Sequence, residues 1–389
     1  MQAKLNLDEV RASRLKSVQR IVIKLGTNTV TGDDGAVCAE RVGPIVQSVA
    51  GLMRSGRQVV LVSSGAVGLG RALLGLHHSR LRDLVTKQAC AAVGQSLLMD
   101  AYKMLFADCD IKIGQVLLTE EDFTAWHRYS NLRHTIDKLL QFGLVPIINE
   151  NDTVSTAEIA VVGKSSRNAV FSDNDRLAAL VMSGLEADAL ILLTNVDGLY
   201  ATQPGRSRKR QENEAPTVIP LVAEITPELK SLATGPTGGG RGGMASKIEA
   251  AEIAMLCGGT AVIANGQTPG VIDRIIAGEK IGTAFLPSKR MKGKHRWIVF
   301  AAGVQGRITV DAGVQSVLTK GKTSLLATGI ARIEGHFAAG DVVEIVDGKG
   351  QEFARGIAHC HSGEAAAKSR GAAKSRIVVR RDNIVLLRN

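Results

Sequence analysis

Two lysines, each beside a glycine-containing turn, are the residues of this chain with the clearest potential for chemistry. Lys24 ends an apolar run and is followed by Gly26, and Lys247 follows the glycine-rich stretch 238–243. A third turn, Ser63–Gly65, follows another apolar run. Such turns expose backbone N–H groups to anions, and a lysine adds a mobile positive charge. Three of them in one chain predict a site that holds a polyphosphate and moves a phosphoryl group.

Phosphoryl transfer needs positioning and positive charge on the oxygens that gain negative charge, and little covalent help. Lys24 would lie at the carboxyl end of a central strand, where ligands bind in open α/β sheets. Lys247 would lie in the first turn of a helix, and the Ser64 hydroxyl could face a substrate. Each lysine alone could be an exposed surface residue, and Ser63–Gly65 an ordinary turn. The presence of both lysines beside glycine turns favours function.

Polar residues gather at three further places, two of them at the ends of expected strands. The segment Asn149–Asp152 suits a substrate with an amine and a carboxylate, with Asp152 facing the ammonium. The segment Ser172–Asp175 precedes a helical pattern, and Ser, Asp and Asn are the usual helix N-caps. Capping needs only one of these side chains, so the others remain available. The segment Thr194–Tyr200 could line a nucleotide pocket or form a turn.

Several protein classes are disfavoured by what the chain lacks. Neither the P-loop motif G-x-x-x-x-G-K-[ST] nor the H-R-D and D-F-G motifs of protein kinases occur. The five cysteines are scattered without a C-x-x-C pair, which is typical of reduced thiols in a cytoplasmic protein. His359–His361 has no second ligand cluster, so no metal site is predicted. No signal region or long apolar run predicts export or a membrane span.

The elements that must position these residues alternate between strand and helix patterns through residue 286. Length, 389 residues, predicts two domains. The chain is 45% hydrophobic but only 3% aromatic, which is typical of aliphatic cores around parallel sheets. A parallel sheet with helices on both faces, the longest at 83–107, is therefore expected. The expected strands are Arg20–Lys24, Gln58–Val62, Lys112–Leu118, Leu144–Asn149, Ala189–Thr194 and Thr260–Ala264.

The pattern changes after a basic stretch, which predicts a first domain at 1–286, a linker at 287–295 and a second, β-rich domain at 296–389. Residues 287–389 hold 18 Lys and Arg against 8 Asp and Glu, so this part carries nearly all of the net charge of +11. A basic module can indicate nucleic acid, an acidic partner or a soluble face. Its strands are expected at Trp297–Phe300, Arg307–Val310, Ala331–Glu334, Asp341–Val346, Phe353–His359 and Ile377–Val379.

Together these segments resemble the amino acid kinase family, from about Arg20 to the C-terminus. The motifs that carry the resemblance are VIKLGTN, VSSGAVGLG, KQACAAVGQ, INENDTV, SDND, LLTNVDGLY and GGMASK. The resemblance implies a three-layer α/β/α sandwich with a mostly parallel central sheet. The tail resembles a PUA domain, a small β-barrel-like module known from RNA-modifying enzymes.

The resemblance is strongest to members that phosphorylate the side-chain carboxylate of L-glutamate with ATP and Mg²⁺, the first step of proline biosynthesis. It implies that Lys24 and Lys247 contact the ATP phosphates and that Asp175 orients both lysines. An attacking carboxylate is already ionised at neutral pH, so no general base is needed. The implied glutamate-binding residues are Ser64, Asn149, Asp152 and Asn174, with Asp173 close by. The implied nucleotide-binding residues are Lys24, Thr194, Asn195, Arg241, Gly242, Gly243, Met244, Ala245, Ser246 and Lys247.

Two departures from the family pattern and two alternatives accompany this interpretation. Asn195 stands where the family often has Asp, and the segment 158–172 is longer than usual. Another family member that acts on a different acid or phosphate is one alternative. An RNA-binding protein acting through the basic tail is the other, but the few tail aromatics lie in strand patterns, whereas RNA stacking needs exposed rings. A homo-oligomer, dimeric or tetrameric, and feedback inhibition by proline are also implied.

Overall fold

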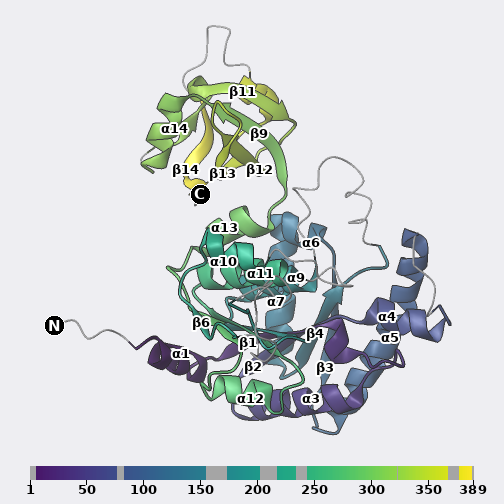
Figure 1. Ribbon diagram of the computed structural model, residues 1–389. Coiled ribbons are helices and arrows are strands. Elements are labelled where there is room, and N and C mark those ends of the chain that lie inside the picture. Colours follow the sequence, from purple (N-terminus) through teal and green to yellow (C-terminus); the bar gives the residue numbers. More distant parts are fainter. Residues whose placement is uncertain are drawn as a thin grey trace, which may run out of the picture. The chain divides into compact units, whose positions relative to one another are not determined.

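The computed structural model describes residues 6–76, 83–154, 173–201, 217–233, 243–321, 323–366 and 376–387 (Figure 1). Its contacts divide the chain into two compact units. The first comprises Met1–Asp122 and His127–Arg290, and the second comprises Phe123–Trp126 and Met291–Asn389. Each unit has its own sheet and its own apolar core.

The first unit is built on an eight-stranded sheet with β1 near its centre. All pairs of neighbouring strands are parallel except β7 and β8, which run antiparallel. The six predicted strands are confirmed within a residue or two at each end. In spatial order the strands are β3 (Ile113–Leu118), β4 (Val145–Glu150), β2 (Gln58–Ser63), β1 (Arg20–Leu25), β5 (Ala189–Thr194), β7 (Thr260–Asn265), β8 (Thr283–Phe285) and β6 (Leu221–Val222).

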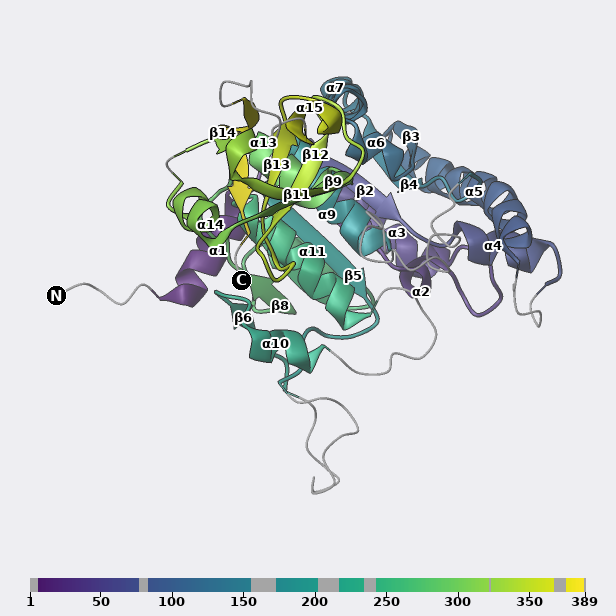
Figure 2. The same ribbon diagram turned by 90° about the horizontal axis from the view of Figure 1, so that it is seen from above.

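Helices cover both faces of this sheet, which confirms the predicted three-layer sandwich (Figures 1 and 2). One face is covered by α3 and α12, and the other by α9 and α11. The helices are α1 (Leu7–Lys16), α2 (Thr27–Val30), α3 (Ala39–Arg54), α4 (Ala66–Leu73), α5 (Leu84–Ala107), α6 (Glu121–Thr124), α7 (Trp126–Gln141), α9 (Asn174–Leu185), α10 (Pro227–Leu232), α11 (Met244–Leu256) and α12 (Val271–Ile276).

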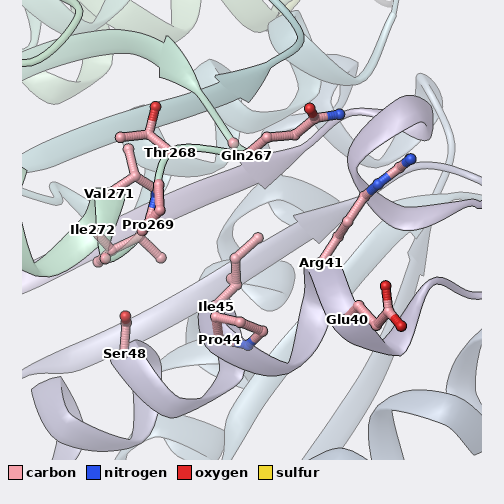
Figure 3. Close-up of a pocket in the computed structure, with 12 residues that line it drawn as sticks. Glu40, Arg41, Pro44, Ile45, Ser48, Gln267, Thr268, Pro269, Val271 and Ile272 are labelled. Carbon is pink, nitrogen blue, oxygen red and sulfur yellow. The ribbon is translucent and has the colours of Figure 1, made fainter.

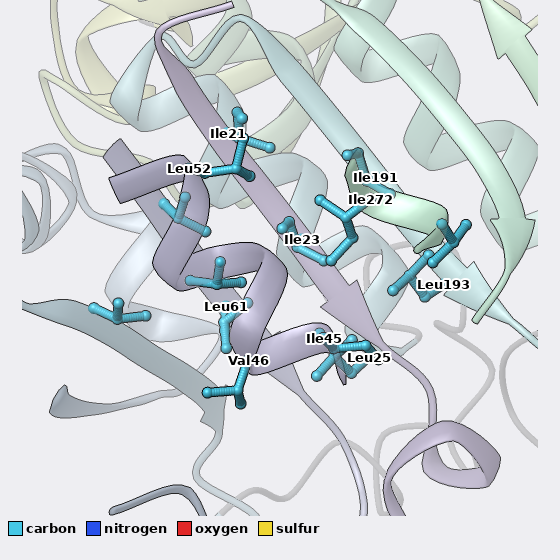
Figure 4. Packing of buried hydrophobic residues seen from close by; sticks show 14 of the residues in the cluster. Ile21, Ile23, Leu25, Ile45, Val46, Leu52, Leu61, Ile191, Leu193 and Ile272 are labelled. Atoms are coloured by element: carbon cyan, nitrogen blue, oxygen red, sulfur yellow. The ribbon is translucent and has the colours of Figure 1, made fainter. Parts of the chain in front are cut away.

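The sheet is held by side chains that are buried on both of its faces. Ile21, Ile23 and Leu25 of β1 point toward α3 and meet Ile45 and Val46 of that helix (Figure 4). All five are at most 3% exposed. Strands buried on both faces are near-continuous aliphatic runs, which is why they could be found in the sequence.

Helices α4 and α5 pack at very short range through two glycines. A Cβ atom on Gly70 would lie 1.8 Å from the Cys90 carbonyl oxygen, and one on Gly94 would lie 1.8 Å from the Ala66 carbonyl oxygen. Any larger side chain would force the helices apart. This contact fixes α5 against the turn at Gly65, which has φ +114° and begins α4.

The second unit is a six-stranded, mostly antiparallel sheet that curls on itself (Figure 1), which confirms the predicted small β-rich domain. Ile308, Val343, Ile345 and Val378 are fully buried in its core. The strands, in spatial order, are β10 (Leu325–Leu326), β14 (Ile377–Leu386), β13 (Glu352–Ala358), β12 (Val342–Val346), β9 (Val304–Val310) and β11 (Ile330–Gly335), and the helices are α13 (Gly293–Arg296), η1 (Trp297–Ala301), α14 (Ala312–Thr319), η2 (Ala327–Gly329) and α15 (Ser362–Ala366).

The strand predicted at Trp297–Phe300 is wrong, because Trp297–Ala301 forms the π-helix η1. A strand would bury alternate residues, whereas this segment buries Trp297, Ile298 and Ala301. The Trp297 indole N–H donates to the Phe123 carbonyl oxygen at 2.8 Å, and its ring meets Trp126 edge-on at 5.2 Å. A short apolar run cannot be assigned to helix or strand by composition alone.

Candidate active site

One buried carboxylate holds both candidate lysines. Oδ1 of Asp175 lies 2.7 Å from Nζ of Lys24, and Oδ2 lies 2.9 Å from Nζ of Lys247. Asp175 is fully buried, and the lysines are 6% and 5% exposed. The structure therefore brings together two cations that are more than two hundred residues apart in the sequence.

Three elements bring this trio to the carboxyl edge of the sheet. Lys24 is the penultimate residue of β1, between β2 and β5. Asp175 lies in the first turn of α9, whose N-cap Asp173 accepts from the backbone N–H groups of Asp175 and Arg176 at 3.0 and 3.1 Å. Lys247 lies in the first turn of α11. Two helix N-termini thus add their positive dipole ends to the lysine charges.

The electrostatics of the trio favour an anion. Burial alone would raise the pKa of Asp175, but the charges of Lys24 and Lys247 outweigh it and hold that pKa below its ordinary value. The carboxylate is therefore ionised at neutral pH, and the trio carries one net positive charge. The pKa of the neighbouring Asp173 is raised by burial and by the negative charge of Asp175.

A chain of side-chain hydrogen bonds runs sideways from this trio. Asn174, next to Asp175, donates from Nδ2 to Ser64 Oγ at 2.8 Å and to Asn149 Oδ1 at 3.0 Å. Asn149 in turn donates from Nδ2 to Gln95 Oε1 at 2.9 Å. The chain joins α9, the turn after β2, the end of β4 and α5. Three predicted residues thus lie together, and the fourth is Gln95, which ends the KQACAAVGQ motif but was not predicted as a site residue.

Three polar atoms at this place are buried with neither a hydrogen bond nor an ion pair in the described part of the chain. They are Oδ2 of Asp173, Oδ1 of Asn174 and Nε2 of Gln95. Buried unpaired polar atoms are costly and uncommon in native proteins, so a cluster of them marks a place kept for something other than stability.

The predicted nucleotide-binding residues that the structure describes lie along the same edge. Thr194 ends β5, and its carbonyl oxygen accepts from Gly266 N–H at 2.8 Å. Gly243 is the N-cap of α11, and Ser246 donates from Oγ to Asp175 Oδ2 at 3.3 Å. Asn195 follows β5, and Asp152, which was predicted to bind glutamate, lies in the turn after β4. Met244 and Ala245 begin α11, whereas Arg241, Gly242 and the segment 158–172 lie outside the described residues.

A separate cavity of about 340 Å³ lies between the first half of α3 and the loop from β7 to α12 (Figure 3). Arg41 and Gln267 lie at one end, and Pro269, Val271 and Ile272 lie at the other (Figure 3). None of its lining residues was predicted to bind substrate or nucleotide. Nη1 of Arg41 also donates to the carbonyl oxygens of Asn28 and Thr31, which ties α3 to α2 beside the Lys24 turn.

Comparison with known proteins gives the family. The model of the amino acid kinase family matches residues 19–265, and the model of the PUA domain matches residues 306–378. The chain belongs to the amino acid kinase family. This amino acid kinase is 42% identical to the glutamate 5-kinase of Moorella thermoacetica, over 96% of this chain and 97% of the relative. It is 41% identical to that of Citrifermentans bemidjiense, over 97% of this chain and 100% of the relative.

Among solved structures, a UMP kinase from Bacillus anthracis aligns with 70% of this amino acid kinase and 97% of its own chain, with 16% identity and a TM-score of 0.46. In the part of the chain that the structure describes, no helix is long and apolar enough to span a membrane.

Proposed function

We propose that this chain transfers the γ-phosphoryl group of ATP to the side-chain carboxylate of L-glutamate, giving ADP and L-glutamate 5-phosphate. This is the first step of proline biosynthesis. The observation that carries the proposal is the pair of buried lysines on Asp175, at 2.7 and 2.9 Å, beside a chain of polar side chains. The similarity to glutamate 5-kinases over nearly the whole chain supports it.

Lys24 and Lys247 would stabilise the negative charge that the phosphoryl oxygens carry during transfer. Asp175 would hold the two ammonium groups a short distance apart, so that both face the same phosphate group. It is unsuited to act as a base, because each of its oxygens faces a lysine and its pKa is lowered. No base is needed, since the attacking glutamate carboxylate is ionised at neutral pH.

The substrates would lie on either side of the lysines. Ser64 and Asn174, with Asn149 behind them, would bind glutamate, and Asp152 would face its ammonium group. Thr194, Asn195 and the loop that ends at Lys247, including Arg241 and Gly242, would bind the nucleotide. The carboxyl edge of a parallel sheet is where ligands of such folds bind.

Mg²⁺ would enter with ATP. In the described part of the chain, no group of three or more His, Cys, Asp or Glu side chains could hold a metal ion. Mg²⁺ commonly needs only one or two carboxylates when phosphates supply other ligands. The buried Oδ2 of Asp173 has no partner among the described residues, so it fits this need. When bound, Mg²⁺ would neutralise phosphate charge, and Asp173 would be the residue that holds it.

An acid panel tests the proposed function. The full-length chain is offered glutamate, aspartate, N-acetylglutamate or carbamate with Mg-ATP, and ADP formation is followed. We expect ADP with glutamate and at most a small fraction of that rate with the other three. A preference for any other acid overturns the proposal.

Five expectations from the sequence stay predictions. They are the domain boundaries, the homo-oligomeric state, inhibition by proline, a cytoplasmic location and the expectation that RNA is not a main partner.

A further inference from the structure

Gln95 lies at the back of the polar chain, on α5. Its side chain is 8% exposed, and the Asn149 side chain to which it is bonded is 2% exposed. The neighbouring Gly94 allows α5 to approach α4, since a Cβ atom there would lie 1.8 Å from the Ala66 carbonyl oxygen. The close packing of the two helices therefore sets where Gln95 stands relative to the Ser64 turn.

The direction of each hydrogen bond in the chain follows from backbone groups, whose donors and acceptors are certain. Glu150 N–H donates to Asn149 Oδ1 at 2.9 Å, so the other amide atom of Asn149, Nδ2, faces Gln95. Because Asn149 presents this Oδ1 oxygen to Asn174 at 3.0 Å, the Asn174 atom that faces it is the donor Nδ2. Gln95 therefore accepts through its oxygen, and its Nε2 is directed elsewhere.

The Nε2 atom of Gln95 is buried and has no hydrogen-bond partner among the described residues. An unpaired buried donor destabilises a fold, and among the described residues this amide makes only one hydrogen bond in return. That bond is the one its oxygen accepts from Asn149. A contribution to stability therefore does not explain an amide at this position. The orientation of Asn149, which the amide fixes, does explain it.

We propose that Gln95 is a positioning residue for glutamate binding, an inference that rests on the proposed function. Gln95 holds Asn149, Asn149 holds Asn174, and Asn174 with Ser64 forms the half-buried front of the chain that faces the substrate. Without the oxygen at position 95, the Asn149 amide loses its acceptor and turns to find another. Asn174 then loses its fixed orientation, while the lysines on Asp175 keep theirs.

The test compares three variants of the full-length protein. Gln95→Met keeps the length and shape but removes the acceptor, Gln95→Asn keeps an amide but withdraws it by one carbon, and Gln95→Glu keeps an acceptor in place. Ser96→Ala is the matched control, because it also removes one side-chain hydrogen bond from α5, at an exposed position. KM for glutamate, KM for ATP, kcat and thermal unfolding are measured for each.

We expect Gln95→Met and Gln95→Asn to raise KM for glutamate about tenfold, the loss of roughly one hydrogen bond. KM for ATP and kcat should stay within about twofold, and Gln95→Glu and Ser96→Ala should resemble the wild type. A residue with a merely structural role would lower the unfolding temperature without separating the two KM values.

Each other outcome overturns the inference. An unchanged KM for glutamate in Gln95→Met, or in Gln95→Asn if Gln95→Met does not fold, shows that the chain does not depend on Gln95. A larger rise in Gln95→Glu than in Gln95→Met shows that Nε2 contacts the substrate carboxylate directly. If the wild-type chain forms no ADP with glutamate, the proposed function is overturned as well. If the wild type is active and the variants keep its KM for glutamate, only the positioning role is overturned.

Discussion

Replacing Asp175 by Asn tests the lysine pair most directly. The change keeps the size and one acceptor of the side chain but removes the charge that both lysines share. If the two ammonium groups are about 5 Å apart across the carboxylate, their repulsion at an effective dielectric constant of about 20 is about 3 kcal/mol. In the wild type, attraction to Asp175 offsets this repulsion. In the variant the lysines separate, and one of them no longer faces the phosphoryl group.

A loss of about 3 kcal/mol of transition-state stabilisation corresponds to a fall in kcat of roughly 200-fold. The assay is ADP formation with saturating glutamate and Mg-ATP. Asp188→Asn is the matched control, because Asp188 is also a carboxylate with two donors, the backbone N–H groups of Gln19 and Arg20 at 2.8 and 2.9 Å. It lies at the opposite edge of the sheet, just before β5. If folded Asp175→Asn keeps more than a tenth of the wild-type kcat, the reasoning is wrong.

The same variant has a pH dependence with a definite sign. The pKa of Asp175 is lowered in the folded state, so its ionisation stabilises the fold above its ordinary pKa of about 3.9 and that stabilisation is lost as the pH falls through the lowered pKa. The stability difference between wild type and Asp175→Asn should therefore be constant above about pH 5 and shrink in stronger acid. Urea unfolding at several pH values measures it, and a difference that grows on acidification contradicts the assigned ion pairs.

The two lysines, the neighbouring Asp173 and the helix contact at Gly94 can each be tested by substitution. Lys24→Met and Lys247→Met should each lower kcat about 10³-fold or more, because each removes a positive charge that faces the transferring phosphoryl group. Circular dichroism should show that both variants are folded. Near-normal turnover in either would refute the two-lysine mechanism. Asp173→Asn should stabilise the ligand-free protein as the pH rises above about 4, because burial and the charge of Asp175 raise the pKa of Asp173 and Asn caps helices as well as Asp. The same variant should need a higher Mg²⁺ concentration for half-maximal rate. An unchanged Mg²⁺ requirement would remove Asp173 from the metal site. Gly94→Ala should destabilise the fold by about 3 kcal/mol or more, since its Cβ atom would lie 1.8 Å from the Ala66 carbonyl oxygen; an unchanged unfolding temperature would show that α4 and α5 separate easily.

The sheet could be predicted well because its strands are short aliphatic runs bounded by polar residues. β1 and β5 are buried on both faces, so their sequences carry few polar interruptions. β6 and β8 were not predicted, since two and three residues are too few to show a period. The segment Trp297–Phe300 is apolar throughout and therefore predicts a strand, and only the contacts of Trp297 show why Trp297–Ala301 is helical.

The site could be predicted in part, for reasons that differ from residue to residue. Lys24 and Asn149 could be found because a polar side chain at the end of an apolar strand is conspicuous. Gln95 could not be assigned a role, because an amide within a long helix shows no such contrast until Asn149 is seen beside it. Its sequence signal is its place at the end of the KQACAAVGQ motif, and the structure adds that it lies on the buried face of α5, where a polar side chain needs a reason.

The position of Asp175 links the assembly of the fold to the assembly of the site. Lys24 comes from β1, Asp175 from α9 and Lys247 from α11, so the trio exists only when both helices have packed on the same face of the sheet. Until then two lysines and a carboxylate remain in water, where their attraction is weak. Packing places them in a buried setting in which each charge needs the others, because removing one partner leaves an uncompensated charge. The charged trio that serves phosphoryl transfer therefore forms only when α9 and α11 have packed correctly. A variant that loosens α9 or α11 should lose activity before it loses its sheet.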